Sequence, residues 1–406
     1  MWEILIKDRE AEPYIKKLEE IAETLKNDPL ETRNIGLMGG KIGVALFFFY
    51  YAKYKADDSM AEYAVELISE VFDEINNDFT LHTYAAGIAG IGWSIELLAK
   101  NGFLEIDSEE TLSGLDNYLY KAMMYEINNS GHYDFLHGAI GIGTYFLSRV
   151  SNPESRKYVE ELIDKLEEKS QKDDDGARKW LSILTIETND KGYNLSLSHG
   201  ISSIIIFLSK AIQMGIATEK ATPLLNDSIR FLLKHRSTQP DATSFFPSWV
   251  KDDVVDKWSR LAWCYGDLGN ALALLQAGRI LGNKEWEQLA IQVFTLAAGR
   301  RDLKQNMVVD AGLCHGAAGI MHVFNRAYQE THIELFKETT LYWAQNLLEM
   351  AVHEGGYAGY KAWHTEKYGG WKCEPGLLEG ITGIGLALIQ LISDNDSTWD
   401  SSLYIS

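Results

Sequence analysis

Seven stretches of this sequence share one pattern, in which a glycine is followed by residues that are apolar on nearly every side of a helix. Six of the stretches read Gly-x-x-Gly, and in the fourth Ser203 replaces the second glycine. They recur at intervals of 47 to 66 residues, which is typical of a supersecondary repeat. The stretches begin at Gly40, Gly87, Gly138, Gly200, Gly266, Gly316 and Gly380.

The pattern predicts two helices in every repeat. The helix after each glycine should be buried on all sides, because its residues are apolar all round. Between these stretches lie amphipathic segments whose apolar residues recur at helical spacing. Two such stripes are formed by Tyr63, Leu67, Ile68, Val71 and Phe72, and by Trp286, Leu289, Ala290, Val293 and Phe294. Each repeat is therefore an outer amphipathic helix, a loop and an inner buried helix, and strands are expected to be minor.

Helix pairs of this kind stack into an open solenoid or close into a ring. A buried inner layer needs apolar cover on both lateral sides, which favours closure. We therefore expect an all-α fold, an α/α toroid (barrel) of seven helix pairs and about fourteen helices, formed by one domain over residues 1–406. The glycine loops should all open at one end. Longer intervals leave room for small insertions, most clearly at His235–Asp256, which contains Pro240 and Pro247.

Composition and charge argue against several classes of protein. The chain has 406 residues, of which 46% are hydrophobic and 24% charged, and a formal net charge of −20. That charge argues against binding nucleic acid or anionic membranes. Three cysteines do not make a disulfide framework, and the N-terminus lacks a signal peptide. The longest apolar run, residues 43–52, is too short to span a bilayer. We expect a cytoplasmic protein without a transmembrane segment.

Two of the cysteines occupy equivalent positions in different repeats. Cys264 and Cys314 each lie two residues before a Gly-x-x-Gly, and His315 directly follows the second. If equivalent positions lie at equivalent depths, two thiols and an imidazole meet, and three such ligands are typical of a catalytic zinc with an open position. The alternative is two buried cysteines that act as small hydrophobic residues. Cys373 lies outside the pattern and is expected to be structural or exposed.

Other polar residues lie at the corresponding ends of the repeats. His199 directly precedes Gly200, as His315 precedes its own glycine, and Asp134 lies four residues before Gly138. Arg260 lies four residues before Cys264, and Tyr265 follows that cysteine. Each has a structural interpretation as well, such as a helix cap for an aspartate. Their shared location at one end of the barrel favours a functional site, and His137 is left open. The four candidates for catalysis are His199, Asp134, Arg260 and Tyr265.

Several motifs resemble the lanthionine synthetase C-like family, the lanthipeptide cyclases. They are S-R-L-A-W-C-Y-G-D-L-G, G-L-C-H-G-A-A-G, Y-D-F-L-H-G, S-L-S-H-G-I and L-L-E-G-I-T-G-I-G. The resemblance extends from Gly36 to about Leu391, and the pair W-C-x-G and C-H-G is its most specific part. It implies an α/α toroid with one zinc ion per chain, held by Cys264, Cys314 and His315. Position 137 departs from the family pattern.

The resemblance also implies a reaction and partners. A peptide cysteine thiol would add to dehydroalanine or dehydrobutyrine in a dehydrated precursor peptide, with His199 as general acid/base oriented by Asp134. Arg260 and Tyr265 would line the same reaction site. No dehydratase-sized region precedes the repeats, so the chain resembles stand-alone cyclases, which would work with a separate dehydratase and a transporter. The tyrosine at position 265 favours a bacterial-type enzyme.

Three alternatives remain at this stage. The same chemistry would serve to add glutathione or another small thiol to dehydroamino acids in proteins. A protein of a different class would hold zinc and bind a precursor peptide without converting it. A sugar-processing α/α barrel would be expected to carry paired carboxylates in its loops, where this chain has cysteine and histidine.

Overall fold

A computed structural model describes residues 2–27, 34–185, 188–239, 242–251, 254–255, 258–395 and 397–406. The chain forms two compact units. Unit 1 comprises Met1–Leu81, Ala85–Gly87 and Asp302–Ser406, and unit 2 comprises His82–Tyr84 and Ile88–Arg301. Whether the chain is one domain over residues 1–406 stays a prediction.

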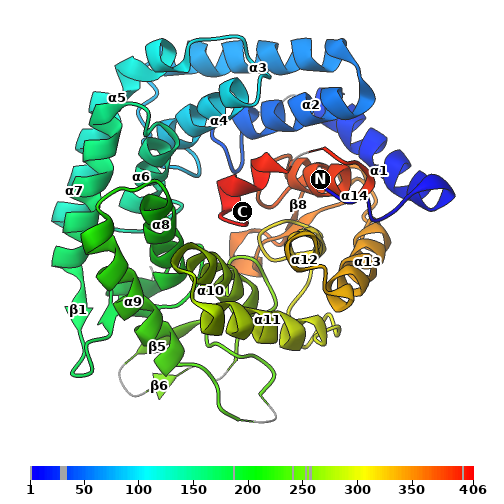
Figure 1. Cartoon of the computed structure of the whole chain (residues 1–406). Helices are drawn as coiled ribbons and strands as arrows, with labels where there is room; N and C mark the ends of the chain where they lie inside the picture. Colours follow the sequence, from blue (N-terminus) through cyan, green and yellow to red (C-terminus); the bar gives the residue numbers. More distant parts are fainter. Residues whose placement is uncertain are drawn as a thin grey trace. The chain divides into compact units, whose positions relative to one another are not determined.

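Unit 1 contains six α-helices and a small hairpin. Its helices are α1 (Asp8–Asn27), α2 (Lys41–Lys55), α3 (Asp58–Asn76), α12 (Ala317–Thr331), α13 (Glu334–Glu349) and α14 (Ile381–Ile392). Strands β7 (Ala362–Trp363) and β8 (Trp371–Lys372) pair antiparallel, and the 3-10 helices are η2 (Glu366–Tyr368) and η3 (Thr398–Leu403). Within this unit α2 packs against α3, and α12 packs against α13 (Figure 1).

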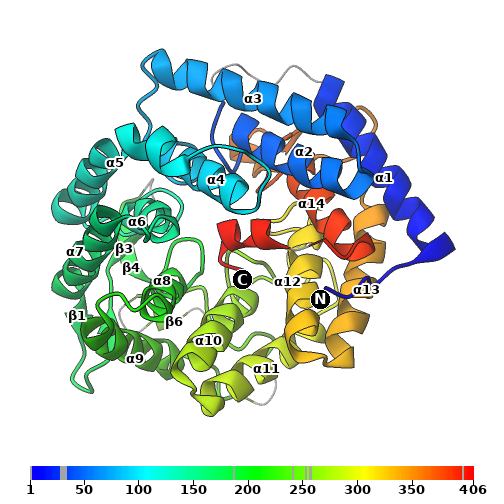
Figure 2. The same ribbon diagram turned by 45° about the horizontal axis from the view of Figure 1, so that its top comes forward.

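Unit 2 contains eight α-helices and most of the strands. Its helices are α4 (Ile88–Lys100), α5 (Ser108–Tyr125), α6 (Ala139–Ser148), α7 (Pro153–Lys169), α8 (Ile201–Gln213), α9 (Thr218–Lys234), α10 (Asp267–Leu281) and α11 (Lys284–Ala298), with one π-helical turn, η1 (Glu126–Ser130). Here α10 packs against α11, and α8 packs against α9 (Figure 2). The described residues thus hold fourteen α-helices, as predicted.

Every predicted inner helix begins directly after its glycine. These helices are α2, α4, α6, α8, α10, α12 and α14, and each starts one residue after the glycine singled out in the sequence. In α2 all residues from Lys41 to Ala52 are buried. A helix buried on every side gains its stability from packing rather than from an amphipathic face. The predicted inner layer is therefore present.

The glycine pair allows a tight loop before each inner helix. In the third repeat the N–H of Ala139 donates to the carbonyl of His132 (3.0 Å), so the chain turns back on itself. A Cβ atom on Gly138 would lie 2.6 Å from that carbonyl oxygen, and one on Gly141 would lie 2.2 Å from the carbonyl oxygen of Phe135. Only glycine allows such close approach of backbone to backbone. The loop residues, which include Asp134, are thereby held at the N-terminal end of the helix.

The outer helices are amphipathic as predicted. In α3 Leu67, Ile68 and Val71 are buried, whereas Tyr63 and Phe72 are half-buried. In α11 Leu289, Ala290, Val293 and Phe294 are buried and Trp286 is half-buried.

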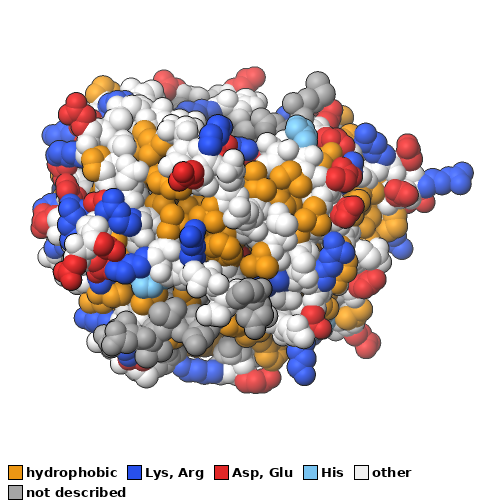
Figure 3. Space-filling view, turned by 60° about the horizontal axis from the view of Figure 1, so that its bottom comes forward, with side chains coloured by type: hydrophobic (Ala, Val, Ile, Leu, Met, Phe, Trp, Pro, Cys, Tyr) orange, Lys and Arg blue, Asp and Glu red, His pale blue; other side chains and the backbone are white. Residues whose placement is uncertain are grey.

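Charged residues cover the solvent-facing sides of these helices. In α3 the acidic residues Glu62, Glu66 and Glu70 are exposed, as expected for a solvated face. On the face shown in Figure 3, acidic, basic and hydrophobic side chains are interspersed. Ion pairs along single helices, such as Lys284–Glu287 (2.8 Å), each contribute about 0.3 kcal/mol to the stability of the fold. No helix in the described parts of the chain has the length and apolar character needed to cross a membrane.

Strands occupy the longer intervals of unit 2. Strands β3 (Ser182–Thr185), β4 (Asp190–Asn194), β5 (Trp249–Lys251) and β6 (Val254–Val255) form an antiparallel sheet in that order, and β1 (Gln171–Lys172) pairs with β2 (Arg178–Lys179). The predicted insertion at His235–Asp256 supplies β5 and β6. Strand β5 pairs with β4 through Val250 and Tyr193, and β6 pairs with β5. Pro240 and Asp256 of that prediction lie outside the described residues.

The C-terminal residues of unit 1 fold back on α12 through one buried carboxylate. Oδ2 of Asp400 accepts hydrogen bonds from His322 Nε2 (2.9 Å) and Arg326 Nη2 (2.6 Å), and both Asp400 and His322 are fully buried. Burial acts to raise the pKa of Asp400, but the charge of Arg326 and the hydrogen bond from His322 outweigh it and lower the pKa to about 2. The carboxylate therefore stays charged inside the protein.

We expect Asp400→Asn to lower the free energy of unfolding by about 3 kcal/mol at neutral pH, because the change leaves a partly buried arginine without its counter-charge. The folded-state pKa lies below the value of about 3.9 of an unfolded aspartate. The advantage of the native residue should therefore be present above pH 4 and disappear as the pH falls toward 2. Urea denaturation between pH 7 and pH 2 measures both effects. Asp394→Asn, at an exposed position nearby, should change little.

Candidate metal centre and its neighbouring acid–base pair

An aspartate and a histidine from two repeats of unit 2 form a close pair. Asp134 lies in the loop before α6, and His199 lies in the loop before α8. Nδ1 of His199 and Oδ2 of Asp134 are 2.6 Å apart. Oδ1 of Asp134 accepts hydrogen bonds from the backbone N–H groups of Leu136 (2.7 Å) and His137 (2.8 Å). Both carboxylate oxygens are thus bonded, which fixes the orientation of the imidazole.

The electrostatic surroundings favour the charged forms of both members of the pair. Burial acts to raise the pKa of Asp134, but the charge and hydrogen bond of His199 outweigh it and hold the pKa below its usual value. Burial acts in the opposite direction on His199 and lowers its pKa, but the charge of Asp134, its hydrogen bond and the charge of Cys264 raise the pKa above its usual value. One third of the His199 side chain is exposed (33%), so the ring can still meet a ligand. The protonated, positively charged form of the His199 ring is therefore favoured.

Cys264 lies in the loop before α10, close to this pair. Its side chain is buried, and its carbonyl accepts hydrogen bonds from the N–H groups of Leu197 (3.1 Å) and Ser198 (3.3 Å) in the His199 loop. The ring of Tyr265 lies with its centroid 6.1 Å from that of His199. Arg260 is half-buried at the start of the same loop. This segment is a series of bends rather than a helix, so Arg260 and Cys264 are not related by a helical turn.

Cys314 and His315 lie in the loop before α12, in unit 1. The N–H of Cys314 donates to the carbonyl of Leu378 (2.8 Å), in the loop before α14. Nε2 of His315 faces Oδ2 of Asp310 at 3.5 Å. Asp310 is buried and also accepts from the N–H groups of Gly312 (3.1 Å) and Trp363 (2.8 Å).

Asp310 is a buried carboxylate beside His315 that was not predicted from the sequence. Burial acts to raise its pKa, but the hydrogen bond and charge of His315 outweigh burial, so the pKa lies below the usual value. A carboxylate that orients the ring of a ligating histidine is a common partner of metal sites. Its sequence signal is weak, because the equivalent position six residues before the glycine is Asn194 in one repeat and Glu374 in another.

The three residues proposed as ligands offer atoms that lie close together. One ligand atom from each of Cys264, Cys314 and His315 lies within 4.8 Å of the other two. Two thiols and one imidazole suit a borderline-soft cation such as zinc, whereas magnesium and calcium prefer oxygen ligands. The donor set is therefore chemically suited to zinc, and three protein ligands leave a tetrahedral ion one further position.

The sequence also matches a known family. Residues 9–404 match the family described as "Lanthionine synthetase C-like protein". This match extends over nearly the whole chain. The chain belongs to the lanthionine synthetase C-like family.

One solved structure supports the fold of this family member. The structure titled "Nisin cyclase" has a TM-score of 0.75 and 17% sequence identity, over 97% of this chain and 96% of that one. The fold is therefore that of nisin cyclase, an α/α toroid, and the predicted fold class is confirmed. A structure titled "Crystal structure of sugar epimerase from ruminal bacterium" has a TM-score of 0.44 and 12% identity, over 91% of this chain and 90% of that one.

Two further residues of this lanthionine synthetase C-like protein, His137 and Cys373, lie outside the candidate catalytic and ligand sets. The ring of His137 lies nearly parallel to that of His199, with centroids 6.1 Å apart, and its side chain is exposed. His137 contributes to the site through its backbone N–H, which donates a hydrogen bond to Asp134. The thiol of Cys373 lies 3.3 Å from the carbonyl oxygen of Gly355 and is not in the Cys264, Cys314 and His315 group. Cys373 is half-buried, and its expected role as a structural or exposed thiol stays a prediction.

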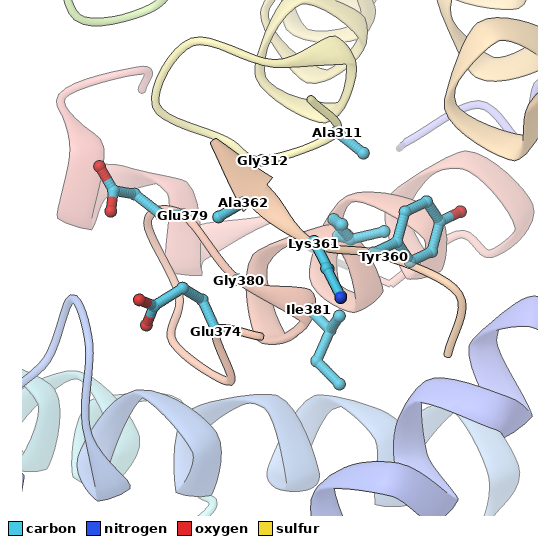
Figure 4. A pocket seen from close by; sticks show the side chains of 10 residues that line it. Ala311, Gly312, Tyr360, Lys361, Ala362, Glu374, Glu379, Gly380 and Ile381 are labelled. Carbon is cyan, nitrogen blue, oxygen red and sulfur yellow. The ribbon is translucent and has the colours of Figure 1, made fainter. Parts of the chain in front are cut away.

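A small cavity lies in unit 1 between the β7 hairpin and the start of α14. Figure 4 shows Glu374 and Glu379 on the loop before α14, with Lys361 and Ala362 on the hairpin. Its volume is about 10 Å³, which is room for one water molecule. The cavity is therefore too small for a peptide side chain.

Proposed function

We propose that this protein is a zinc-dependent lanthipeptide cyclase. It adds a cysteine thiol of a dehydrated precursor peptide to dehydroalanine or dehydrobutyrine of the same peptide and forms a thioether ring. The observation that carries the proposal is the group of Cys264, Cys314 and His315, whose ligand atoms lie within 4.8 Å of one another. Family membership and the acid–base pair of Asp134 and His199 support it.

The proposed ligands are the thiolates of Cys264 and Cys314 and the imidazole of His315. Because Nε2 of His315 faces Asp310, Nδ1 is the ring nitrogen proposed to ligate. A zinc ion held by these residues would supply Lewis-acid chemistry that lowers the pKa of a peptide thiol and makes it a nucleophile near neutral pH.

The acid–base pair of Asp134 and His199 is proposed to supply the proton that completes the reaction. When sulfur bonds to the β-carbon, the carbon–carbon double bond becomes an enolate, whose α-carbon must receive a proton. His199 is the proposed donor, because its pKa is raised and the side chain is partly exposed. Asp134 holds the ring through Nδ1, which leaves Nε2 to carry the transferred proton. The proton returned to the α-carbon balances the one lost by the thiol, so the peptide mass does not change.

Arg260 and Tyr265 are proposed to assist at the same place. Tyr265 lies beside His199, and its hydroxyl accepts a hydrogen bond from Asn194 Nδ2 (3.4 Å). A phenol in this position orients the imidazole or shares the proton transfer. Arg260 begins the loop that carries Cys264, and its positive charge would stabilise the negative charge of the enolate.

We expect Asp310→Asn to weaken zinc binding roughly 10- to 100-fold, because the ring of His315 loses the carboxylate that orients it. Asparagine keeps one oxygen for the N–H of Gly312, so the loop itself should persist. Competition with a chromophoric chelator measures the affinity. Asp302→Asn, an exposed aspartate earlier in unit 1, serves as the matched control. Equal zinc affinity of Asp310→Asn and the control would contradict the role.

The function is tested with a chemically dehydrated peptide that contains one cysteine and one dehydroalanine. The expected product has the same mass as the substrate but no longer reacts with iodoacetamide. A mass increase only when glutathione is present would instead indicate addition of a small thiol. Zinc bound without any thioether formed would indicate a peptide-binding scaffold.

A further inference from the structure

The loop that carries Cys264 has a different backbone from the loops of the other repeats. It ends at Gly266, whose φ is +83°, whereas Gly40, Gly138, Gly200, Gly316 and Gly380 at the same position have φ between −134° and −106°. A Cβ on Gly266 would lie 2.4 Å from the hydroxyl oxygen of Ser259. The end of this loop therefore packs directly against its beginning, in a conformation that favours glycine.

A single arginine bonds to both ends of this loop. Nη1 of Arg300 donates to Oδ2 of Asp267 (3.0 Å), the first residue after the loop. Nη2 of Arg300 donates to the carbonyl oxygen of Ser259 (2.6 Å), at the start of the loop. The side chains of Asp267 and Arg300 are 0% and 6% exposed, so the ion pair is shielded from water. The planar guanidinium can bridge two acceptors in a fixed geometry.

Asp267 also holds the neighbouring chain segment. Its Oδ1 accepts from the N–H groups of Phe245 (2.9 Å) and Phe246 (2.8 Å). The hydroxyl of Ser244 in that segment accepts from the N–H of Ser259 (3.0 Å). The beginning and the end of the loop are therefore bonded to the same two elements, Arg300 and the segment around residues 244–246.

We propose that Arg300 and Asp267 are positioning residues for the Cys264 thiol. They hold residues 259–267 in the irregular conformation that sets Cys264 in the proposed zinc site. The inference rests on the proposed function, because that function makes the Cys264 thiol a zinc ligand. The pair is proposed to act on Cys264 through the loop.

The test compares Arg300→Lys with Arg149→Lys in the full-length protein. Lysine keeps the positive charge but has one donor centre, so it cannot bridge two acceptors in this way. Arg149 is the matched control, because it too is buried in unit 2 and bonds both a carboxylate (Asp116, 3.3 Å) and a backbone carbonyl (Ser108, 3.0 Å).

Two readouts are measured: the rate of Cys264 alkylation in zinc-free protein, followed by peptide mass spectrometry, and the rate of zinc release to a chelator. We expect both rates to rise about tenfold or more in Arg300→Lys, since the loop opens more often, and to stay within about twofold in Arg149→Lys. Native rates in a folded Arg300→Lys protein, or an equal rise in both variants, would overturn the proposal.

Ser244→Ala is a milder second variant, in case Arg300→Lys does not fold. It removes one hydrogen bond at the start of the loop, and an increase of about threefold in Cys264 alkylation is expected. An unchanged alkylation rate would overturn the proposal. If the native protein binds no zinc, the proposed function fails, but the alkylation rates still decide whether the pair positions Cys264.

Discussion

Replacement of His199 by alanine should slow ring closure by about 10²- to 10⁴-fold, the usual contribution of a positioned general acid. The physical reason is the loss of the imidazole whose Nδ1 bonds to Asp134 and whose pKa is raised. Water would then have to protonate the enolate without a fixed orientation. Because His199 is not among the proposed ligands, the variant should bind as much zinc as the native protein. Single-turnover cyclisation of a dehydrated peptide measures the rate, and metal analysis measures the zinc.

A matched control for His199→Ala is His132→Ala. His132 also pairs with a carboxylate of unit 2, since its Nδ1 lies 3.0 Å from Oε2 of Glu126, and it is partly exposed. Its replacement should leave the cyclisation rate within about twofold of the native value, as for most surface changes. A native rate in His199→Ala would remove His199 from the mechanism. Loss of zinc in that variant would show that its role is structural rather than in proton transfer.

Replacement of Cys314 by alanine should reduce bound zinc to less than about one tenth of an ion per chain and abolish cyclisation. With one of three ligands removed, only Cys264 and His315 remain, and two ligands seldom hold zinc against a competing chelator. Zinc content after dialysis and the cyclisation rate are measured on the same sample. Cys373→Ala is the matched control, because this cysteine is not in the group of three and should keep both zinc and activity.

A Cys314→Ala protein with a full complement of zinc would refute the ligand assignment. Loss of zinc in both cysteine variants would instead indicate a general loss of structure, which circular dichroism would detect. The two variants together separate the effect on the ligand set from an effect on folding.

The inner helices were predictable because their signal is local. Each begins directly after a glycine, and the tight loop at Gly138 and Gly141 leaves no room for a side chain. Repeats also made equivalent positions comparable, so the closeness of Cys264 to Cys314 and His315 could be predicted from their positions before glycines alone. The same reasoning placed Asp134 and His199 at corresponding ends of their repeats, and in the structure Nδ1 of His199 lies 2.6 Å from Oδ2 of Asp134.

Other parts of the site depend on contacts that no local pattern records. Asp310 faces His315 from an equivalent position that holds different residues in other repeats. Arg300 follows an outer helix and bonds to Asp267, 33 residues earlier, so their pairing has no periodic signal in the sequence. The small sheet formed by β3 to β6 joins strands from two intervals, and its pairing is also non-local. Such residues become visible only when the chain is folded.

The most direct test of the account is X-ray absorption at the zinc edge, recorded on the purified protein with and without a cysteine-containing peptide. We predict one zinc ion per chain with two sulfur neighbours at about 2.3 Å and two nitrogen or oxygen neighbours at about 2.0–2.1 Å. Addition of the peptide should replace one of the light neighbours by a third sulfur. A protein without zinc, or an ion whose neighbours do not change when the peptide is added, would contradict the account.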